Sequence, residues 1–212
     1  MGIFGRALDY AINDGDRFRA ALATHLQLVA IALLIGIATC VPLGILTSRS
    51  RLAALTLING VNTVRVIPSL AILFLAIPYF GVGQTSALIA LTVLALPPIL
   101  INTDTAFRRI DPAIREAALG MGMSPAQALL RVEFPLALPV MLAGIRIALT
   151  EVIASATLAA FIGAGGLGIY ITLGFAQFEN RILLVGAVPV ALMALLAELG
   201  LSALQRAVQP PR

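Results

Sequence analysis

The sequence predicts an all-α integral membrane protein with five transmembrane helices. Of its 212 residues, 60% are hydrophobic and only 11% are charged, and the mean hydropathy is +1.02. These values are far too apolar for a soluble domain of this length. The charges are also unevenly placed, because they gather between long blocks that carry almost none. At a rise of about 1.5 Å per residue, each block is long enough for a helix to cross a hydrocarbon core of about 30 Å.

Composition excludes several classes of function. All 14 basic residues are arginine, so the chain lacks the lysine of an ordinary phosphate-binding loop, and any ATP hydrolysis must come from a partner. No basic cluster is interleaved with aromatic residues, which argues against a nucleic-acid partner. The lone Cys40 and the lone His25 cannot build a metal or hydrolase site. We expect no catalytic and no metal-binding residues, with Cys40 in the core and His25 at the membrane interface.

The first elements are a surface segment and a membrane span. Residues 1–24 mix apolar and charged side chains without the apolar core of a signal peptide, so they predict an amphipathic or irregular segment at the surface. The block Leu26–Thr47 is free of charge and predicts the first span, which Arg49 and Arg51 follow directly.

The second and third spans are interrupted by proline. Residues 52–80 are apolar but contain several polar residues before Ile67-Pro68-Ser69, which favours one bent helix that breaks at Pro68. Gly81-Val82-Gly83-Gln84 then forms a turn, and the third span is expected over residues 85–103.

A charged stretch at residues 111–135 separates the third span from the fourth. Asp111 is placed to cap a helix that has Pro112 in its first turn, and Gly120 or Gly122 can end that helix. Ser124, Pro125 and Gln127 then form the capping box of a second short helix. Local chemistry alone therefore predicts a helix-turn-helix, with Arg115, Glu116 and Arg131 on its outer face and an apolar side formed by Ile114, Ala117, Ala118, Leu129 and Leu130.

This stretch resembles a known family motif. Glu116-Ala117-Ala118 is followed at fixed spacings by Gly122, Val132 and Phe134-Pro135, which is similar to the EAA loop of binding-protein-dependent ABC importer permeases of the type I fold. The family pattern has Ile and Leu-Pro in the last places, so Val132 and Phe134 are conservative departures. In that family the loop is a coupling helix that docks on a separate ATPase subunit, whereas the plain alternative is an amphipathic connector without a partner. The resemblance implies coupling residues Arg115, Glu116, Ala117, Ala118, Gly122, Ser124, Pro125 and Pro135.

The fourth and fifth spans enclose a glycine-rich run. We expect the fourth span over residues 139–162 and the fifth over 182–204, with a short re-entrant or surface piece ending near Arg181 between them. The run Gly163-Ala164-Gly165-Gly166-Leu167-Gly168, with the preceding Ala160-Phe161-Ile162, resembles osmoprotectant and methionine-type permeases. The Ile67-Pro68-Ser69 run is similar to the osmoprotectant branch. Such a run lets backbones approach closely at a gate or helix crossing, or it is a plain turn.

Arg65, Arg146 and Glu151 are charges within the spans that need an explanation, and the fifth span also contains Glu198. Each costs about 2.5–3.5 kcal/mol at the bilayer centre on insertion scales, so each should face protein or water. Arg146 and Glu151 lie five residues apart and are poorly placed to pair within one helix. Arg65 and Arg146 either snorkel to the cytoplasmic edge or face a pore, and Glu151 suits the path of a cationic or zwitterionic solute. We assign the translocation path or gate to Pro68, Ser69, Arg146, Glu151, Gly163, Gly165, Gly166 and Gly168.

Arginine placement predicts the orientation. The loops that precede the second span, contain the coupling stretch and follow the fifth span hold eight arginines, against four on the other side, and the richer side is cytoplasmic. The expected organisation is an extracytoplasmic segment at 1–24, an ABC importer transmembrane domain at 25–207 with its coupling loop at 111–135, and a cytoplasmic tail at 208–212, all in a multi-pass protein of a bacterial cell membrane.

The resemblance implies a permease subunit that forms the membrane path for an osmoprotectant such as glycine betaine, choline or carnitine. Its expected partners are two ATP-binding subunits that bind ATP and Mg, a second permease that is identical or homologous, an extracytoplasmic solute-binding protein and the bilayer. No cofactor is expected in this chain. A permease for methionine or another amino acid shares the coupling loop and the glycine run. An ion-coupled secondary transporter or channel is the alternative from another class, although the chain has no self-similar halves.

Overall fold

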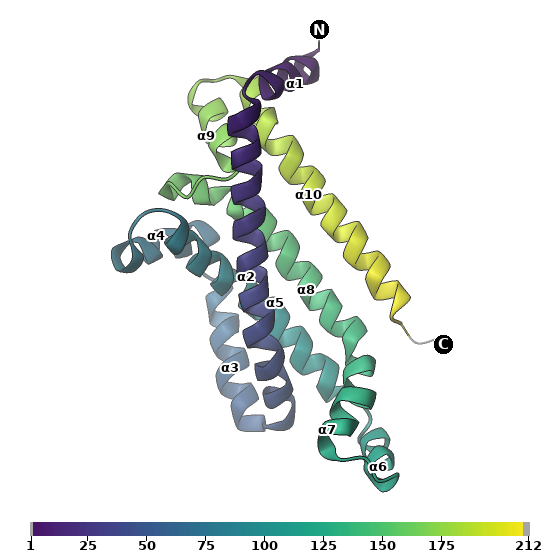
Figure 1. Ribbon diagram of the computed structural model, residues 1–212. Coiled ribbons are helices and arrows are strands. Elements are labelled where there is room, and N and C mark those ends of the chain that lie inside the picture. The colour runs from purple at the N-terminus through teal and green to yellow at the C-terminus, as the bar shows by residue number, and fades with distance from the viewer. Residues whose placement is uncertain (1, 210–212) are drawn as a thin grey trace.

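The computed structural model describes residues 2–209, which form a bundle of helices with no strand in that range (Figure 1). Two irregular helical turns, the π-helical η1 and the 3-10 helix η2, flank α8. In chain order the elements are α1 (Ile3–Asn13), α2 (Gly15–Arg49), α3 (Arg51–Val64), α4 (Ser69–Phe80), α5 (Gln84–Arg108), α6 (Pro112–Gly120), α7 (Pro125–Ala128), η1 (Leu129–Glu133), α8 (Phe134–Ala156), η2 (Leu158–Ile162), α9 (Gly168–Ala176) and α10 (Asn180–Ala207).

The predicted five spans correspond to five apolar helical units. Four are single helical stretches long and apolar enough to cross a membrane: α2, α5, the stretch Pro125–Ala156 and α10. The fifth unit is the pair α3 and α4, which meet at an angle of 99°. Within residues 2–209 the count of five therefore holds if this bent pair is taken as one span.

The first span starts earlier than expected. Helix α2 begins at Gly15 instead of Leu26, because residues 15–25 continue the helix and bury Ala21 and His25. The amphipathic helix expected at the N-terminal surface is α1, which lies across the end of the bundle and contacts α10 (Figure 1). The Tyr170 hydroxyl donates a hydrogen bond of 2.9 Å to Asp14 in the turn between α1 and α2. His25 is fully buried, so its expected place at the membrane interface is wrong.

Helix α5 is the centre of the bundle and packs between α2 and α8. Small residues allow this close packing, as is common where membrane helices cross. A Cβ atom on Gly44 would overlap the Thr103 side chain of α5, and one on Gly144 would overlap the Pro98 carbonyl. Cys40 is buried at the α2–α5 contact, as predicted for a small core residue.

The break near Pro68 occurs where the sequence predicts it, but the bend is much sharper than that of one curved helix. Helix α3 ends at Val64 and α4 starts at Ser69, directly after Pro68. Helix α4 then packs on α5 and η2, so that it leaves the line of α3 (Figure 1). These tertiary contacts set the angle, whereas the proline sets only the place of the break.

The fourth span differs from the prediction at both ends. It was expected over residues 139–162, but α8 begins at Phe134 and continues the helical path from α7 through η1. Pro135 lies directly after the wider turn of η1, inside this continuous helical path. The helix ends at Ala156, since residues 158–162 tighten into η2 before the left-handed Gly163.

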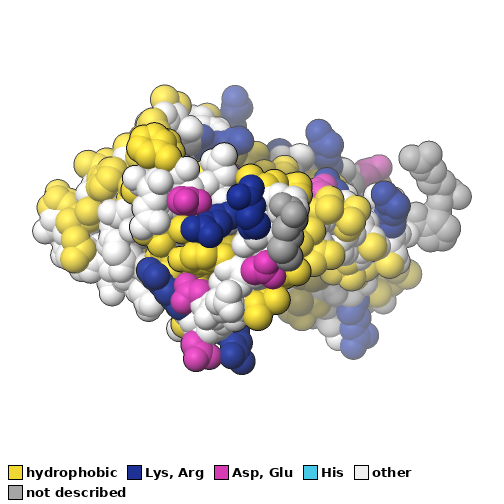
Figure 2. Space-filling view, turned by 90° about the horizontal axis from the view of Figure 1, so that it is seen from above, with side chains coloured by type: hydrophobic (Ala, Val, Ile, Leu, Met, Phe, Trp, Pro, Cys, Tyr) yellow, Lys and Arg dark blue, Asp and Glu magenta, His cyan; other side chains and the backbone are white. Residues whose placement is uncertain are grey.

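The remaining elements close the end of the bundle near the N-terminus. The short piece expected before Arg181 is the helix α9, which packs on α10. Helix α10 exposes the apolar side chains Leu192, Leu195, Leu196, Leu199 and Leu204, a surface that suits the lipid tails of a bilayer. Seen from this end, acidic and basic side chains gather in the middle of the face with apolar side chains around them (Figure 2). Residues 210–212 of the expected cytoplasmic tail lie outside the described residues.

Candidate functional site

The coupling segment, residues 111–135, folds as its local chemistry predicts. Asp111 caps α6 by accepting a hydrogen bond of 2.9 Å from the Ala113 amide. Gly122 has a φ of 86°, which ends the α6 turn in a conformation that glycine adopts readily. The capping box at the start of α7 is complete, with the Gln127 amide donating to Ser124 Oγ and the Ser124 amide donating to Gln127 Oε1.

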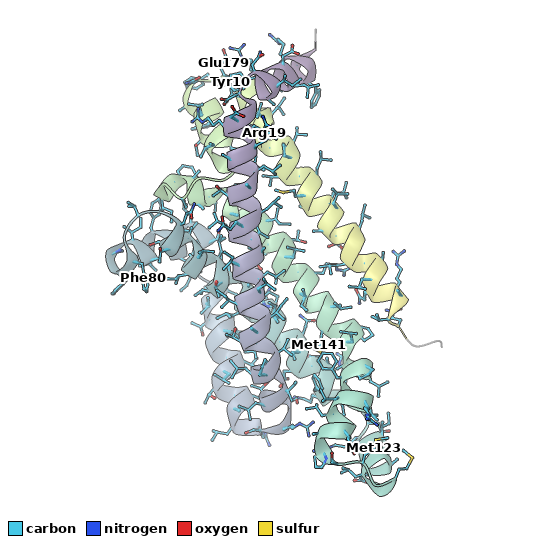
Figure 3. All side chains as sticks on the ribbon, in the orientation of Figure 1. Tyr10, Arg19, Phe80, Met123, Met141 and Glu179 are labelled. Carbon is cyan, nitrogen blue, oxygen red and sulfur yellow. The ribbon has the colours of Figure 1, made fainter. Side chains whose placement is uncertain are left out.

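Helix α6 projects from the bundle with nearly all of its side chains exposed. Only Ala118 of α6 is buried, while Arg115, Glu116 and Ala117 are exposed. Apolar side chains next to them are exposed as well, and Met121 is 72% exposed. The expected apolar side of the segment therefore contributes little to this chain's own core. Figure 3 places Met123 at the far end of the molecule from Tyr10, Arg19 and Glu179.

A buried carboxylate connects the coupling segment to the first span. Glu133, at the end of η1, is 5% exposed. One of its oxygens accepts a hydrogen bond of 2.7 Å from Arg49 Nη2, and the other lies 3.5 Å from Arg115 Nε. Arg49 ends α2 and Arg115 belongs to α6. Glu133 therefore joins α6, the end of α2 and the start of α8 by polar contacts.

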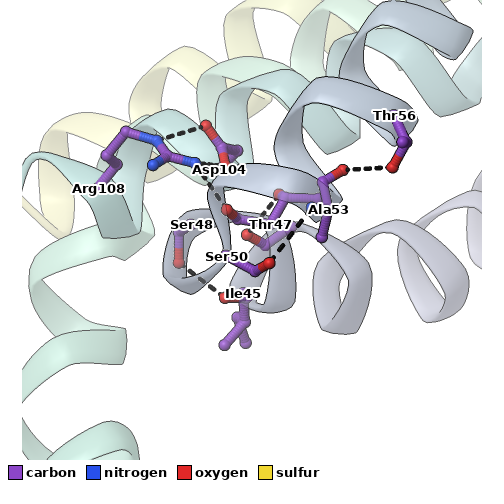
Figure 4. A network of polar contacts seen from close by, with 9 residues as sticks. Ile45, Thr47, Ser48, Ser50, Ala53, Thr56, Asp104 and Arg108 are labelled. Carbon is purple, nitrogen blue, oxygen red and sulfur yellow. Dashed lines mark hydrogen bonds and ion pairs between the residues drawn. The ribbon is translucent and has the colours of Figure 1, made fainter.

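A second polar network lies beside the first. Arg108 pairs with Asp104 at 2.6 Å and donates a hydrogen bond of 2.7 Å to the Thr47 carbonyl, so it joins the ends of α5 and α2 (Figure 4). Between these two networks and α6 is a cavity of about 430 Å³, whose lining includes Glu116 and Glu133. The contact between the base of α6 and the bundle is therefore polar and partly open, and it is not a packed apolar contact.

A separate cavity of about 320 Å³ lies at the break between α3 and α4. We call it the polar pocket, defined by Arg65, Pro68, Ser69, Glu151 and Ser155. Three of the residues predicted for the translocation path, namely Pro68, Ser69 and Glu151, therefore meet in one place. They come from two separate parts of the chain, the α3–α4 break and the second half of α8.

Arg146 lies elsewhere and has partners within the chain. Its Nη1 atom contacts Glu198 Oε1 of α10 at 3.3 Å and donates a hydrogen bond of 2.5 Å to the Ser202 hydroxyl. As expected, Arg146 does not pair with Glu151. The structure places this predicted path residue in a polar contact between α8 and α10, away from the lining of the polar pocket.

The glycine run forms a tight connection between η2 and α9. Gly163, Gly165 and Gly166 all have positive φ values, and Gly166 lies against His25 of α2. Gly168 packs so closely on the end of α8 that a Cβ atom there would overlap the Thr157 carbonyl. The run therefore contains a turn at Gly163, Gly165 and Gly166 and a close backbone approach at Gly168.

Comparison with known proteins identifies the family. Residues 40–211 match the family described as "Binding-protein-dependent transport system inner membrane component". The chain belongs to this family. It is therefore a multi-pass membrane protein and a component of a transport system.

Curated relatives match this permease over most of its length. It is 44% identical over 198 residues to the carnitine transport permease protein OpuCB of Listeria monocytogenes, covering 93% of this chain and 91% of the relative. It is 41% identical to the choline transport system permease protein OpuBB of Bacillus subtilis, covering 88% and 86% of the two chains. The osmoprotectant import permease protein OsmW of Salmonella typhimurium is 36% identical, and the match covers 96% of this chain and 97% of the relative.

Solved structures share the fold of the permease. Two inward-facing crystal forms of the MetNI methionine ABC transporter align with TM-scores of 0.77 and 0.79 at 24% and 22% identity. The alignments cover 91% and 93% of this chain and 96% and 99% of the other. The predicted fold of type I importer permeases is thereby confirmed.

Several residues of the permease site escaped the sequence-based assignment. Glu133 and Arg49 are 84 positions apart, so nothing local indicates that they pair. Glu198 was noted in the fifth span but not matched with Arg146. His25 Nε2 donates a hydrogen bond to the Ile153 carbonyl, 128 positions away. The one available signal was Glu133 itself, a carboxylate directly before an apolar span, where burial demands a partner.

Proposed function

We propose that this permease forms the membrane path of an ATP-driven importer for an osmoprotectant, a quaternary amine such as glycine betaine, choline or carnitine. The transport functions of its relatives support the solute class. The exposed helix α6, connected through Glu133 to α2 and α8, is the observation that supports ATP-driven operation. A helix that is connected to the bundle at its base and uncovered elsewhere suits the groove of a partner subunit.

The proposed assembly contains two permeases, identical or homologous, with two ATP-binding subunits and an extracytoplasmic solute-binding protein. ATP and Mg are bound by the ATP-binding subunits, and no cofactor belongs to this chain. Closure of those subunits pushes on the coupling segment, and the push passes through Glu133 and η1 into α2 and α8. The bundle then changes from inward-facing to outward-facing and receives solute from the binding protein.

We propose separate roles for the coupling segment, the polar pocket, the glycine run and Arg146. The coupling contacts are Arg115, Glu116, Ala117, Ala118, Gly122, Ser124, Pro125 and Pro135. Pro68, Ser69 and Glu151 line the path at the polar pocket. The glycine run acts where η2 and α9 cross the end of α8, close to the path, and Arg146 holds α8 against α10.

Uptake into proteoliposomes tests this function. We expect vesicles that hold the permease, its ATPase and its binding protein to import labelled glycine betaine, carnitine or choline only with internal ATP. Glu116→Ala and Gly122→Ala should each lower that uptake about tenfold or more, because one changes the exposed face of α6 and the other strains the backbone at φ 86°.

The outcomes of the uptake experiment separate the alternatives. If the vesicles import methionine and none of the quaternary amines, the permease is one for amino acids. Uptake that needs no ATP and tolerates both substitutions would favour an ion-coupled carrier and contradict the importer.

We propose an orientation in which the N-terminus is extracytoplasmic and the coupling segment and C-terminus are cytoplasmic. The excess of arginine near the coupling segment supports it. A cysteine introduced at Phe178, 92% exposed between α9 and α10, should react with a membrane-impermeant maleimide on right-side-out vesicles. A cysteine at Met121 should react only after the membrane is made permeable. Cys40→Ala provides the background, and the reverse labelling pattern would refute the orientation.

A further inference from the structure

The polar pocket lies near the middle of α5, a helix long and apolar enough to cross a membrane. Pro97 of α5 lines it, and Pro97 is 13 residues from Gln84 and 11 residues from Arg108, the two ends of α5. At about 1.5 Å per residue these separations are roughly 20 Å and 17 Å. The break between α3 and α4 opens the pocket at this depth, as in other transporters whose sites are built on interrupted helices.

Opposite charges face this pocket from two elements. Arg65 follows the last residue of α3, and Glu151 belongs to α8. Among residues 2–209 neither side chain has an ion-pair partner within 4 Å, although both line the same cavity. Charges at this depth are costly unless water, protein or a ligand compensates them. The pocket thus holds one positive and one negative group that remain available.

The start of α4 adds positive potential on the Arg65 side. Ser69, which lines the pocket, is the first residue of this 12-residue helix, and no side chain caps it. The N-terminus of a helix carries a partial positive charge. An anionic group is therefore favoured near Arg65 and Ser69, and a cationic group is favoured near Glu151.

We propose that the polar pocket is a transient binding site for zwitterionic solutes that carry a quaternary ammonium group and a carboxylate. Glu151 faces the ammonium group, and Arg65 donates hydrogen bonds to the carboxylate. This site rests on the importer function proposed above and adds to it a selection step inside the membrane path. The cavity of about 320 Å³ is at the lower end of the volumes of small-molecule sites.

Glu151 and Arg65 bind their parts of the solute by different interactions, and this difference can be measured. A quaternary ammonium group has no N–H to donate, so Glu151 attracts it by charge alone, whereas a carboxylate accepts paired hydrogen bonds from guanidinium. The residues that line the pocket include no aromatic side chain, so no cation–π cage strengthens the ammonium contact. The resulting weak affinity suits a site that must release its solute. Choline lacks a carboxylate, so it interacts with Glu151 but not with Arg65.

Equilibrium binding to the purified permease–ATPase complex without its solute-binding protein tests the site. Labelled glycine betaine and labelled choline are titrated against the wild-type complex, Arg65→Gln and Glu151→Gln. We expect Arg65→Gln to raise the Kd of glycine betaine about tenfold and that of choline less than twofold. Glu151→Gln should raise both Kd values about tenfold. This dependence on the solute's carboxylate is a pattern that simple loss of structure does not produce.

Two variants outside the pocket serve as controls. Arg51→Gln changes an exposed arginine at the other end of α3, and Glu179→Gln changes a carboxylate far from the pocket, so both should bind as the wild type does. The proposal is overturned if the wild-type complex binds neither solute saturably while it imports them once the binding protein is added. It is also overturned if Arg65→Gln raises the Kd of choline as much as that of glycine betaine. Failure of ATP-dependent import by the wild-type complex would instead refute the underlying function.

Discussion

Replacing Glu133 by alanine is expected to lower solute uptake per ATP hydrolysed at least tenfold in the assembled transporter. The buried carboxylate contacts Arg49 at 2.7 Å and Arg115 at 3.5 Å, and it is the direct polar link from α6 to α2. Removing one partner of a fully buried ion pair costs about 3–5 kcal/mol. Partial exposure of both arginines reduces that cost, so we expect the complex to assemble while the push on α6 no longer reaches α2. Parallel assays of ATP hydrolysis and of labelled uptake in the same proteoliposomes measure the ratio.

Two comparisons show whether the effect belongs to the ion pair. In Arg49→Ala the same pair is lost from the other side, so the double variant Arg49→Ala/Glu133→Ala should be no worse than the more impaired single variant. Glu179→Ala removes a carboxylate that pairs with Arg181 at 3.1 Å but is half exposed at the other end of the molecule, and it should leave the ratio unchanged. Normal uptake per ATP in a well-assembled Glu133→Ala complex would show that the link carries no coupling.

The coupling segment shows how much of the site could be predicted. Its caps depend on residues within three positions of each other, so Asp111 with Pro112 and Ser124 with Gln127 could be assigned correctly from the chain alone. The direct continuation of α7 into α8 could not be assigned. It depends on η1, where the Phe134 amide donates to the Leu129 carbonyl and the wider turn leads into Pro135. The local chemistry of residues 111–135 predicts a separate helix-turn-helix, so the fourth span was expected only from residue 139.

Burial and pairing across the bundle were the features that escaped prediction. Hydropathy indicates that Glu151 and Arg65 need polar surroundings, but not that the α3–α4 bend of 99° brings them to one cavity. His25 was placed at an interface because it borders an apolar block. The helix instead starts ten residues before it, at Gly15, and buries it against Ile153. In each case the decisive contact joins residues far apart in the chain, and local propensity contains no information about it.

Gly168→Ala is expected to lower the thermal unfolding midpoint more than any other glycine-to-alanine change at the glycine run. A Cβ atom at this position would overlap the backbone carbonyl of Thr157, and backbone cannot rotate away as a side chain can. Overpacking typically costs about 1–3 kcal/mol, and a backbone clash belongs at the top of that range. For a chain of this length the midpoint falls roughly 2–4 °C per kcal/mol, which gives a drop of roughly 6–12 °C. Cys40 is buried, so a thiol-reactive fluorogenic dye reports the transition in detergent.

Gly200→Ala is the matched control for this prediction. Gly200 lies within α10, and no atom comes within 4 Å of a Cβ built there. Alanine in a helix interior is more stable than glycine by about 0.5–1 kcal/mol, so the midpoint should stay the same or rise slightly. A similar loss in both variants would mean that the helices tolerate no added methyl group anywhere. A loss confined to Gly168 would place its close approach to the Thr157 carbonyl among the contacts that stabilise the fold.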